Sequence, residues 1–225
     1  MTGFSLTSIV TSFMSREEKN TVLIAVHCGE PDENCFCSSM KLEKSYDLYF
    51  YDTGREYYID MGSEKGASLV NHLPNKTMKI PDIKSPRELK NKNIAAQHEN
   101  HIWDKLSEEC VSCGRCTMLC PNCLCFDVND VSKLGCAKKG ERGRRWDSCQ
   151  LKDFTEVAGG YVFRADRAAR FKHRVYHKLV YFKDKFGSYM CTGCGRCITH
   201  CPNKIDWLKA ADLLAQNGKT KTCNP

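Results

Sequence analysis

A cysteine motif that occurs twice constrains the fold of this chain more than any other feature. It reads CVSCGRCTMLCP at residues 110–121 and CTGCGRCITHCP at residues 191–202. The shared pattern, CxxCGRCxxxCP, has the spacing with which bacterial ferredoxins bind [4Fe–4S] clusters. Three cysteines spaced by two residues wrap around one cluster, whereas the fourth is carried away to the other cluster. The proline that follows ends the turn.

We therefore expect two [4Fe–4S] clusters with crossed ligation. The ligands are Cys110, Cys113, Cys116 and Cys201 for one cluster, and Cys191, Cys194, Cys197 and Cys120 for the other. Paired structural zinc sites are the alternative, and two complete copies with the terminal proline argue against them. About 70 residues separate the two motifs, which leaves room for helices and favours an electron-transfer subunit over a small free carrier.

Eight of the 16 cysteines lie outside these motifs, and five of the eight form a second pattern. HCGEPDENCFC contains Cys28, Cys35 and Cys37, and CPNCLC contains Cys123 and Cys125. Residues i and i+2 of an extended chain point the same way, so each Cys-x-Cys can present two thiols to one point. This pattern predicts a third metal site, with a further iron–sulfur cluster as the favoured occupant and buried packing cysteines as the alternative.

The three remaining cysteines have a smaller part in this interpretation. Cys149, in RRWDSCQ, is a reserve ligand for the third site. Cys136 and Cys223 are interpreted as incidental.

The net charge of +7 is concentrated in two basic segments, at residues 138–145 and 164–178. Nucleic acid can bind such patches, so a nucleic-acid-binding iron–sulfur protein is the alternative function. A solvated face or a surface for an acidic protein is the simpler interpretation. Cations beside an anionic cluster also make its reduction easier, which explains the basic excess without nucleic acid.

The cysteine clusters are typical of metal binding in a reducing compartment. The first residues, MTGFSLTSIVTSFMSREE, do not resemble a secretory or transit peptide, and no apolar run approaches the length of a membrane span. We expect a cytoplasmic protein that is not inserted in a membrane.

The coarse pattern of the chain predicts an α+β fold in two parts. Residues 1–84 are expected to form a small α/β portion, with a buried strand in NTVLIAVHC, a hairpin around Asp52-Thr53-Gly54 and a helix over 63–73. Residues 85–225 are expected to form a helical ferredoxin-type domain with two clusters. Its predicted helices span 85–106, where Ser85-Pro86-Arg87-Glu88 resembles a capping box, 165–185, which Gly187 is expected to end, and 205–216.

Several segments together resemble the family that contains the iron–sulfur subunit of anaerobic sulfite reductase and the beta subunit of sulfhydrogenase. They are VLIAVHCGEPDENCFCSSM, YDLYFYDTG, CPNCLCFDV, RRWDSCQLKDF, AGGYVFRADRAARFKHRVYHK and CTGCGRCITHCPNKID. The resemblance extends from Asn20 to about Leu214. Relatives usually carry roughly another hundred residues before the VLIAVHC strand, whereas about 20 precede it here.

The resemblance implies an electron-transfer iron–sulfur subunit of an anaerobic oxidoreductase complex. Such subunits relay electrons between a flavin subunit that uses NAD(P)H and a catalytic partner, which is a hydrogenase, a sulfite reductase or a heterodisulfide reductase assembly. The sequence contains no Walker A loop, GxGxxG, HExxH or GxSxG. We therefore expect a chain without turnover of its own, working in a hetero-oligomer without nucleic acid.

Overall fold

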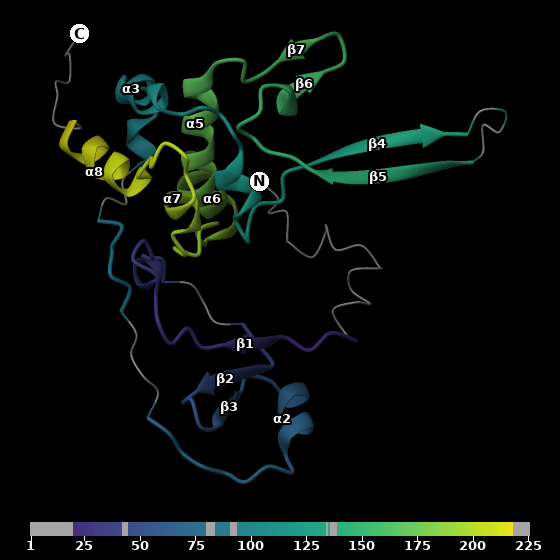
Figure 1. Cartoon of the computed structure of the whole chain (residues 1–225), viewed down its shortest axis with the longest axis vertical. Coiled ribbons are helices and arrows are strands. Elements are labelled where there is room, and N and C mark those ends of the chain that lie inside the picture. Colours follow the sequence, from purple (N-terminus) through teal and green to yellow (C-terminus); the bar gives the residue numbers. More distant parts are fainter. Residues whose placement is uncertain are drawn as a thin grey trace. The chain divides into compact units, whose positions relative to one another are not determined.

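The computed structural model describes residues 20–41, 45–79, 84–90, 94–133, 135 and 139–217. The chain divides into two compact units (Figure 1). The first contains Met1–Pro31 and Glu43–Ile83, and the second contains Asp32–Leu42 and Lys84–Pro225. Residues 32–42 thus group with the second unit, although the predicted N-terminal portion included them. The described residues mix helix and strand, as expected.

The first unit contains a three-stranded sheet in the order β1-β2-β3. Strand β1 (Ile24–Val26) pairs in parallel with β2 (Leu48–Asp52), and β2 pairs antiparallel with β3 (Tyr57–Met61). The hairpin predicted around Asp52-Thr53-Gly54 is confirmed, and the Asp52 carboxylate accepts a hydrogen bond from Gly54 N at 2.7 Å. The prediction of a buried first strand is wrong. β1 is an edge strand, and Ile24 and Val26 are 57% and 66% exposed.

A short helix, α2 (Glu64–Val70), follows β3 where a helix was predicted. Ser63 caps its start by accepting a hydrogen bond from Gly66 N at 3.1 Å, and its own hydroxyl donates to the Asp47 carboxylate at 2.5 Å. The glycine at position 66, inside this helix, is explained by packing. A Cβ there would lie 2.0 Å from the Asp47 carbonyl oxygen, so only glycine lets the helix lie this close to the chain before β2.

Helices build the core of the second unit (Figure 1). The central one is α5 (Arg167–Tyr176), which continues through the π-helical turn η5 (His177–Tyr181) into α6 (Phe182–Phe186). Asp166 caps its start, and Gly187 ends it in the left-handed conformation, as predicted. Around it lie α3 (Ile102–Glu108), α4 (Arg115–Met118), α7 (Arg196–Thr199) and α8 (Trp207–Asn217).

The long helix predicted over 85–106 is wrong. Within its described part, the structure has only the 3-10 turn η3 (Ala95–Gln97) and the start of α3. Ser85 does not cap a helix. Its N–H donates to the Ser38 hydroxyl at 2.8 Å, and its own hydroxyl accepts from Ser38 N at 3.2 Å. Arg87 N donates to the Cys35 carbonyl at 3.1 Å, so this segment lies along the chain around η2 (Cys37–Ser39) and is not helical.

Two antiparallel strand pairs were not predicted. The first joins β4 (Phe126–Ser132) to β5 (Gly140–Trp146), and the second joins β6 (Glu156–Val157) to β7 (Tyr161–Val162). The β4–β5 ribbon begins directly after Cys125 and extends away from the helices (Figure 1). In the described part of the chain, no helix combines the length and apolarity that a membrane crossing requires.

Candidate metal centres

Both cysteine motifs adopt the same local structure, a loop followed by a single helical turn. Gly114 and Gly195 stand before α4 and α7 with φ of 76° and 69°, which a residue with a side chain adopts only at a cost. The carbonyl of each glycine then accepts hydrogen bonds from the first turn of the helix. The first three cysteines of each motif therefore stay on the loop and first turn, whereas the fourth follows the helix.

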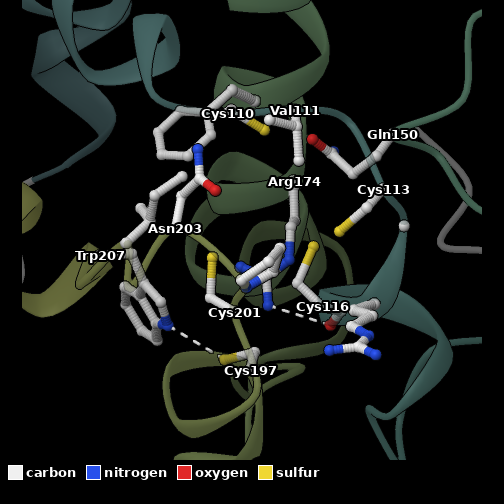
Figure 2. A pocket seen from close by; sticks show the side chains of 15 residues that line it. Cys110, Val111, Cys113, Cys116, Gln150, Arg174, Cys197, Cys201, Asn203 and Trp207 are labelled. Carbon is white, nitrogen blue, oxygen red and sulfur yellow. Dashed lines mark hydrogen bonds between the residues drawn. The ribbon is translucent and has the colours of Figure 1, made fainter.

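The first hollow combines the first three cysteines of one motif with the last cysteine of the other. Its lining includes Cys110, Cys113, Cys116 and Cys201, and Cys197 of the second motif also lines it. Figure 2 shows their sulfur atoms turned toward the side chain of Arg174, which lies among them. Trp207 and Asn203 complete one wall, and Gln150 lies on the opposite side (Figure 2).

The second hollow has the reciprocal composition. Its lining includes Cys191, Cys194, Cys197 and Cys120. Trp207 Nε1 donates a hydrogen bond to Cys197 Sγ at 3.3 Å, and Gly193 N donates to Cys191 Sγ at 3.4 Å. Cysteines of both motifs thus line each hollow, and Cys197 lines both of them.

Two buried cations border these hollows. Arg174 is 8% exposed and Lys178 is 4% exposed. Arg174 lines both hollows, and its Nη2 donates to the Cys116 carbonyl at 3.2 Å, whereas its buried Nε has no partner. Lys178 lines the second hollow and donates to Cys120 Sγ at 3.2 Å. Among the residues that the structure describes, neither cation pairs with a carboxylate.

Burial and charge pull the ionisation of this centre in opposite directions. Burial raises the pKa of Cys116 to about 11 and that of Cys191 to about 12, so the free thiols hold their protons at neutral pH. Burial alone would lower the pKa of Arg174, but the charges of Cys116 and Cys197 as thiolates raise it well above its ordinary value. The cations are therefore compensated only when the cysteines are thiolates, the form in which cysteine binds metal.

These residues fit an iron–sulfur cluster better than a single metal ion. Within the described ranges, no three His, Cys, Asp or Glu side chains are grouped closely enough to hold one ion. A cluster places iron and sulfide between its ligands, so its thiolates stand further apart than those on one ion. An anionic cluster would also supply the negative charge that Arg174 and its unpartnered Nε lack.

The five cysteines of the predicted third site are divided between the two units. Cys28 belongs to the first unit, and the other four belong to the second. Cys35 donates to the Cys194 carbonyl at 3.5 Å, so the Cys35–Cys37 turn lies against the second motif. Cys123, which is buried, and Cys125 lie just before the start of β4. Cys136 and Cys223 lie outside the described residues.

Three residues of the site, Arg174, Lys178 and Trp207, were not predicted from the sequence as part of it. One signal was available for the cations. Arg174 and Lys178 are four residues apart in a helical pattern whose apolar members, Phe171 and Val175, predict the buried face of the helix. A charge on that face needs a compensating partner.

Comparison with known proteins defines first the class and then the family of this chain. A family model described as a 4Fe-4S dicluster domain matches residues 109–205, which include every cysteine of the two motifs. The chain is therefore an iron–sulfur protein of the dicluster class. Sulfhydrogenase 2 subunit beta of Pyrococcus furiosus is 32% identical to it over an alignment of 225 positions. The alignment covers 91% of this chain and 66% of that protein.

The chain belongs to the family of iron–sulfur subunits that includes the sulfhydrogenase beta subunit, as the sequence resemblance indicated. It spans 66% of the length of the relative that it matches. No solved structure matches it.

Proposed function

We propose that this chain is the electron-transfer iron–sulfur subunit of an anaerobic oxidoreductase complex. It relays electrons between a flavin subunit that uses NAD(P)H and a catalytic partner of the hydrogenase, sulfite reductase or heterodisulfide reductase type. Two [4Fe–4S] clusters carry the electrons. The first is held by Cys110, Cys113, Cys116 and Cys201, and the second by Cys191, Cys194, Cys197 and Cys120.

One observation carries this proposal. Arg174 is buried between the two cysteine hollows and lines both of them, with its Nε unpartnered. A cation in that position would stabilise the added negative charge of a reduced cluster held by either group of cysteines. Two clusters on the same buried cation are also near neighbours, as a relay requires.

The clusters supply one-electron redox chemistry when bound, and the chain supplies their surroundings. Arg174 and Lys178 favour the reduced state through their charge. The hydrogen bond from Trp207 to Cys197 Sγ acts in the same direction, because it withdraws charge from a ligand sulfur. The helical core keeps water away from the second hollow, where Lys178 is only 4% exposed.

The ion pairs and the burial of the basic residues argue against nucleic-acid binding. In the first basic segment, Arg142 donates to both Asp130 carboxylate oxygens at 2.7 Å, and Arg145 lies 3.6 Å from Asp127. In the second segment, Arg170, Arg174 and Lys178 are buried. Part of the positive charge is therefore paired with carboxylates or buried and is not free to bind phosphate.

The proposal is tested on the complex purified anaerobically through a tag on this chain. Mass spectrometry identifies the co-purifying subunits, and absorbance at the cluster bands follows the addition of NADH or NADPH. We expect a flavin subunit in the complex and bleaching of the clusters by NAD(P)H. Clusters that stay oxidised in a complex containing a reduced flavin would contradict the relay.

A further inference from the structure

Both faces of the β4–β5 ribbon are open to solvent. Every residue of β4 is exposed, and Gly143 is the one residue of β5 that is partly buried. The ribbon extends away from the helical core (Figure 1). A two-stranded ribbon without a cover is only marginally stable in water, so this ribbon would gain stability from a partner that packs on it.

The pairing register divides the side chains of the ribbon into two faces, because residues directly opposite each other share a face and the faces alternate along each strand. The first, which we call the Trp146 face, carries the pairs Phe126–Trp146, Val128–Arg144 and Asp130–Arg142, and the second face carries Asp127–Arg145, Asn129–Gly143 and Val131–Glu141. The contacts agree with this division. The Arg144 guanidinium lies over the Phe126 ring, 5.0 Å from its centre. Arg142 donates to both Asp130 carboxylate oxygens at 2.7 Å.

The Trp146 face is apolar at the end nearest the core. Trp146 is 69% exposed, and Phe126 and Val128 are 41% and 45% exposed. Leu124, two residues before the ribbon begins, is 70% exposed. Single exposed apolar side chains are common on protein surfaces, whereas these are gathered at one end of one ribbon. Such a patch is typical of a surface on which another protein packs, and tryptophan and arginine are the residues that most often dominate binding there.

The charge of the ribbon indicates what kind of partner fits the Trp146 face. Arg142 is paired with Asp130, whereas no carboxylate among the described residues pairs with Arg144. Residues 126–133 and 139–146 together contain five Lys or Arg and three Asp or Glu, which gives a net charge of +2. An apolar face with an unpaired cation is complementary to an apolar surface that bears a carboxylate. The exposed Asp127 and Glu141 on the second face repel phosphate, which makes nucleic acid a poorer fit.

The Trp146 face lies beside the first cysteine motif. Ser148, two residues after Trp146, is hydrogen-bonded to the Thr117 hydroxyl in α4. Met118, the last residue of α4, and Leu119 after it are 51% and 41% exposed. The exposed apolar surface therefore occurs both on the ribbon and on the helical turn of the motif, so a protein bound there would sit next to the first hollow.

We infer that the Trp146 face docks a redox partner subunit whose contact surface is apolar and bears carboxylates, and that this partner lies beside the first cluster. This inference rests on the proposed function and deepens it, because it assigns the surface through which the chain meets its partner. The second face of the ribbon stays in solvent.

The first test measures how tightly the partner binds. The complex is purified without oxygen through a tag on this chain, and the separated partner is mixed again with each variant to obtain the dissociation constant. Trp146→Ser should weaken binding about ten- to thirtyfold, as a central tryptophan of an interface does. Val131→Ser is the matched control, because Val131 lies on the second face and is 60% exposed. It should change the dissociation constant by less than about twofold, and iron analysis restricts the comparison to variants with equal cluster content.

The second test identifies the chemistry of the contact. Arg144→Lys keeps the positive charge and allows a carbodiimide to join position 144 to a carboxylate in direct contact. Glu141→Lys places the same group on the second face and is the control. Mass spectrometry of the complex should find position 144 joined to an Asp or Glu of the partner subunit, and should find no such link from position 141.

The outcomes separate this inference from the function on which it rests. An unchanged dissociation constant for Trp146→Ser, or the absence of a link from position 144 to the partner, would overturn the docking surface. A link from position 144 to a second copy of this chain would also overturn it, and so would tight binding of a DNA or RNA oligonucleotide that Arg144→Ser abolishes. Bleaching of the clusters by NAD(P)H would still support the relay in each of these cases. Absence of a flavin subunit from the unchanged complex would refute the proposed function itself.

Discussion

The two copies of the cysteine motif are nearly identical in sequence, but different parts of the chain cover them. The first loop packs against Ser148, whose Cβ lies 2.9 Å from where a Cβ on Gly114 would stand. The second packs against Asn34, whose carbonyl oxygen lies 2.4 Å from the same position on Gly195. Each covering segment also carries cysteines, Cys149 in one case and Cys35 and Cys37 in the other.

The electrostatic surroundings differ as well. Of the two buried cations, only Arg174 borders the first hollow, which is also lined by the exposed Arg115 and contains Cys113, which is exposed. The second is bordered by both Arg174 and Lys178, and its four cysteines are all partly buried. We therefore expect the ligand spacing to determine that two clusters bind, and the covering segments and the cations to set how the two differ. We expect the second cluster to have the higher reduction potential.

The largest effect should come from breaking the crossed ligation. We compare the effect of Cys120→Ala in two variants. The first background carries Cys110→Ala and lacks the first cluster. The second background carries Cys191→Ala and lacks the second cluster. In the first background the added change should remove about four more irons, because Cys120 serves the remaining cluster. In the second background it should remove none from the ferredoxin-type clusters, as judged by iron content and EPR. The reverse result would show that each motif binds its own cluster.

Lys178 should set the potential of the second cluster. Replacing it by Met removes a positive charge near the ligand Cys120 and should lower that potential by about 50–150 mV, on the basis of a Coulomb energy at an effective dielectric constant of about 20. The first cluster should shift less. Lys183→Met, on the exposed part of the same helical segment, is the control and should leave both potentials within about 20 mV. An EPR-monitored redox titration measures both. Equal shifts of the two clusters would contradict the assignment.

A smaller effect is expected from exchanging the residues at one position of the motif. Gly193 corresponds to Ser112 in the repeat, and both have positive φ, of 73° and 53°. A Cβ on Gly193 would lie 2.6 Å from the backbone N of Cys37, so Gly193→Ser should destabilise the second unit by about 1–3 kcal/mol.

The matched change, Ser112→Gly, should alter stability by less than about 1 kcal/mol, because Ser112 already tolerates this conformation with a side chain. Thermal unfolding of the cluster-loaded protein compares the two. Equal losses of stability in the two variants would mean that the packing of the segment around Cys37 does not depend on a glycine at position 193.

Local patterns predicted much of this molecule. The spacing of the cysteines indicated the dicluster domain, and Asp52-Thr53-Gly54 indicated a hairpin. The periodic segment 165–185 indicated a helix, and Gly187 indicated where that helix ends. These features depend on residues close in sequence. The prediction failed for 85–106, because the hydrogen bonds of Ser85 and Arg87 go to Ser38 and Cys35, which are distant in sequence.

The candidate site was predictable to a similar extent. The ligand groups follow from the repeat, but the positions of Arg174 and Lys178 against them depend on how α5 and η5 pack in the core. The hydrogen bond from Asp147 N to the Cys125 carbonyl depends on β4–β5 pairing, and those strands have exposed side chains on both faces that give a weak pattern. Long-range pairing of this kind leaves no short signature in the sequence.

The central claim is that the two hollows hold [4Fe–4S] clusters. Iron, zinc and acid-labile sulfide analysis of the protein purified without oxygen tests this most directly. We predict at least about eight irons and eight sulfides per chain, with zinc in trace amounts. Stoichiometric zinc with little sulfide would contradict the account, because the cysteines would then form structural zinc sites that carry no electrons.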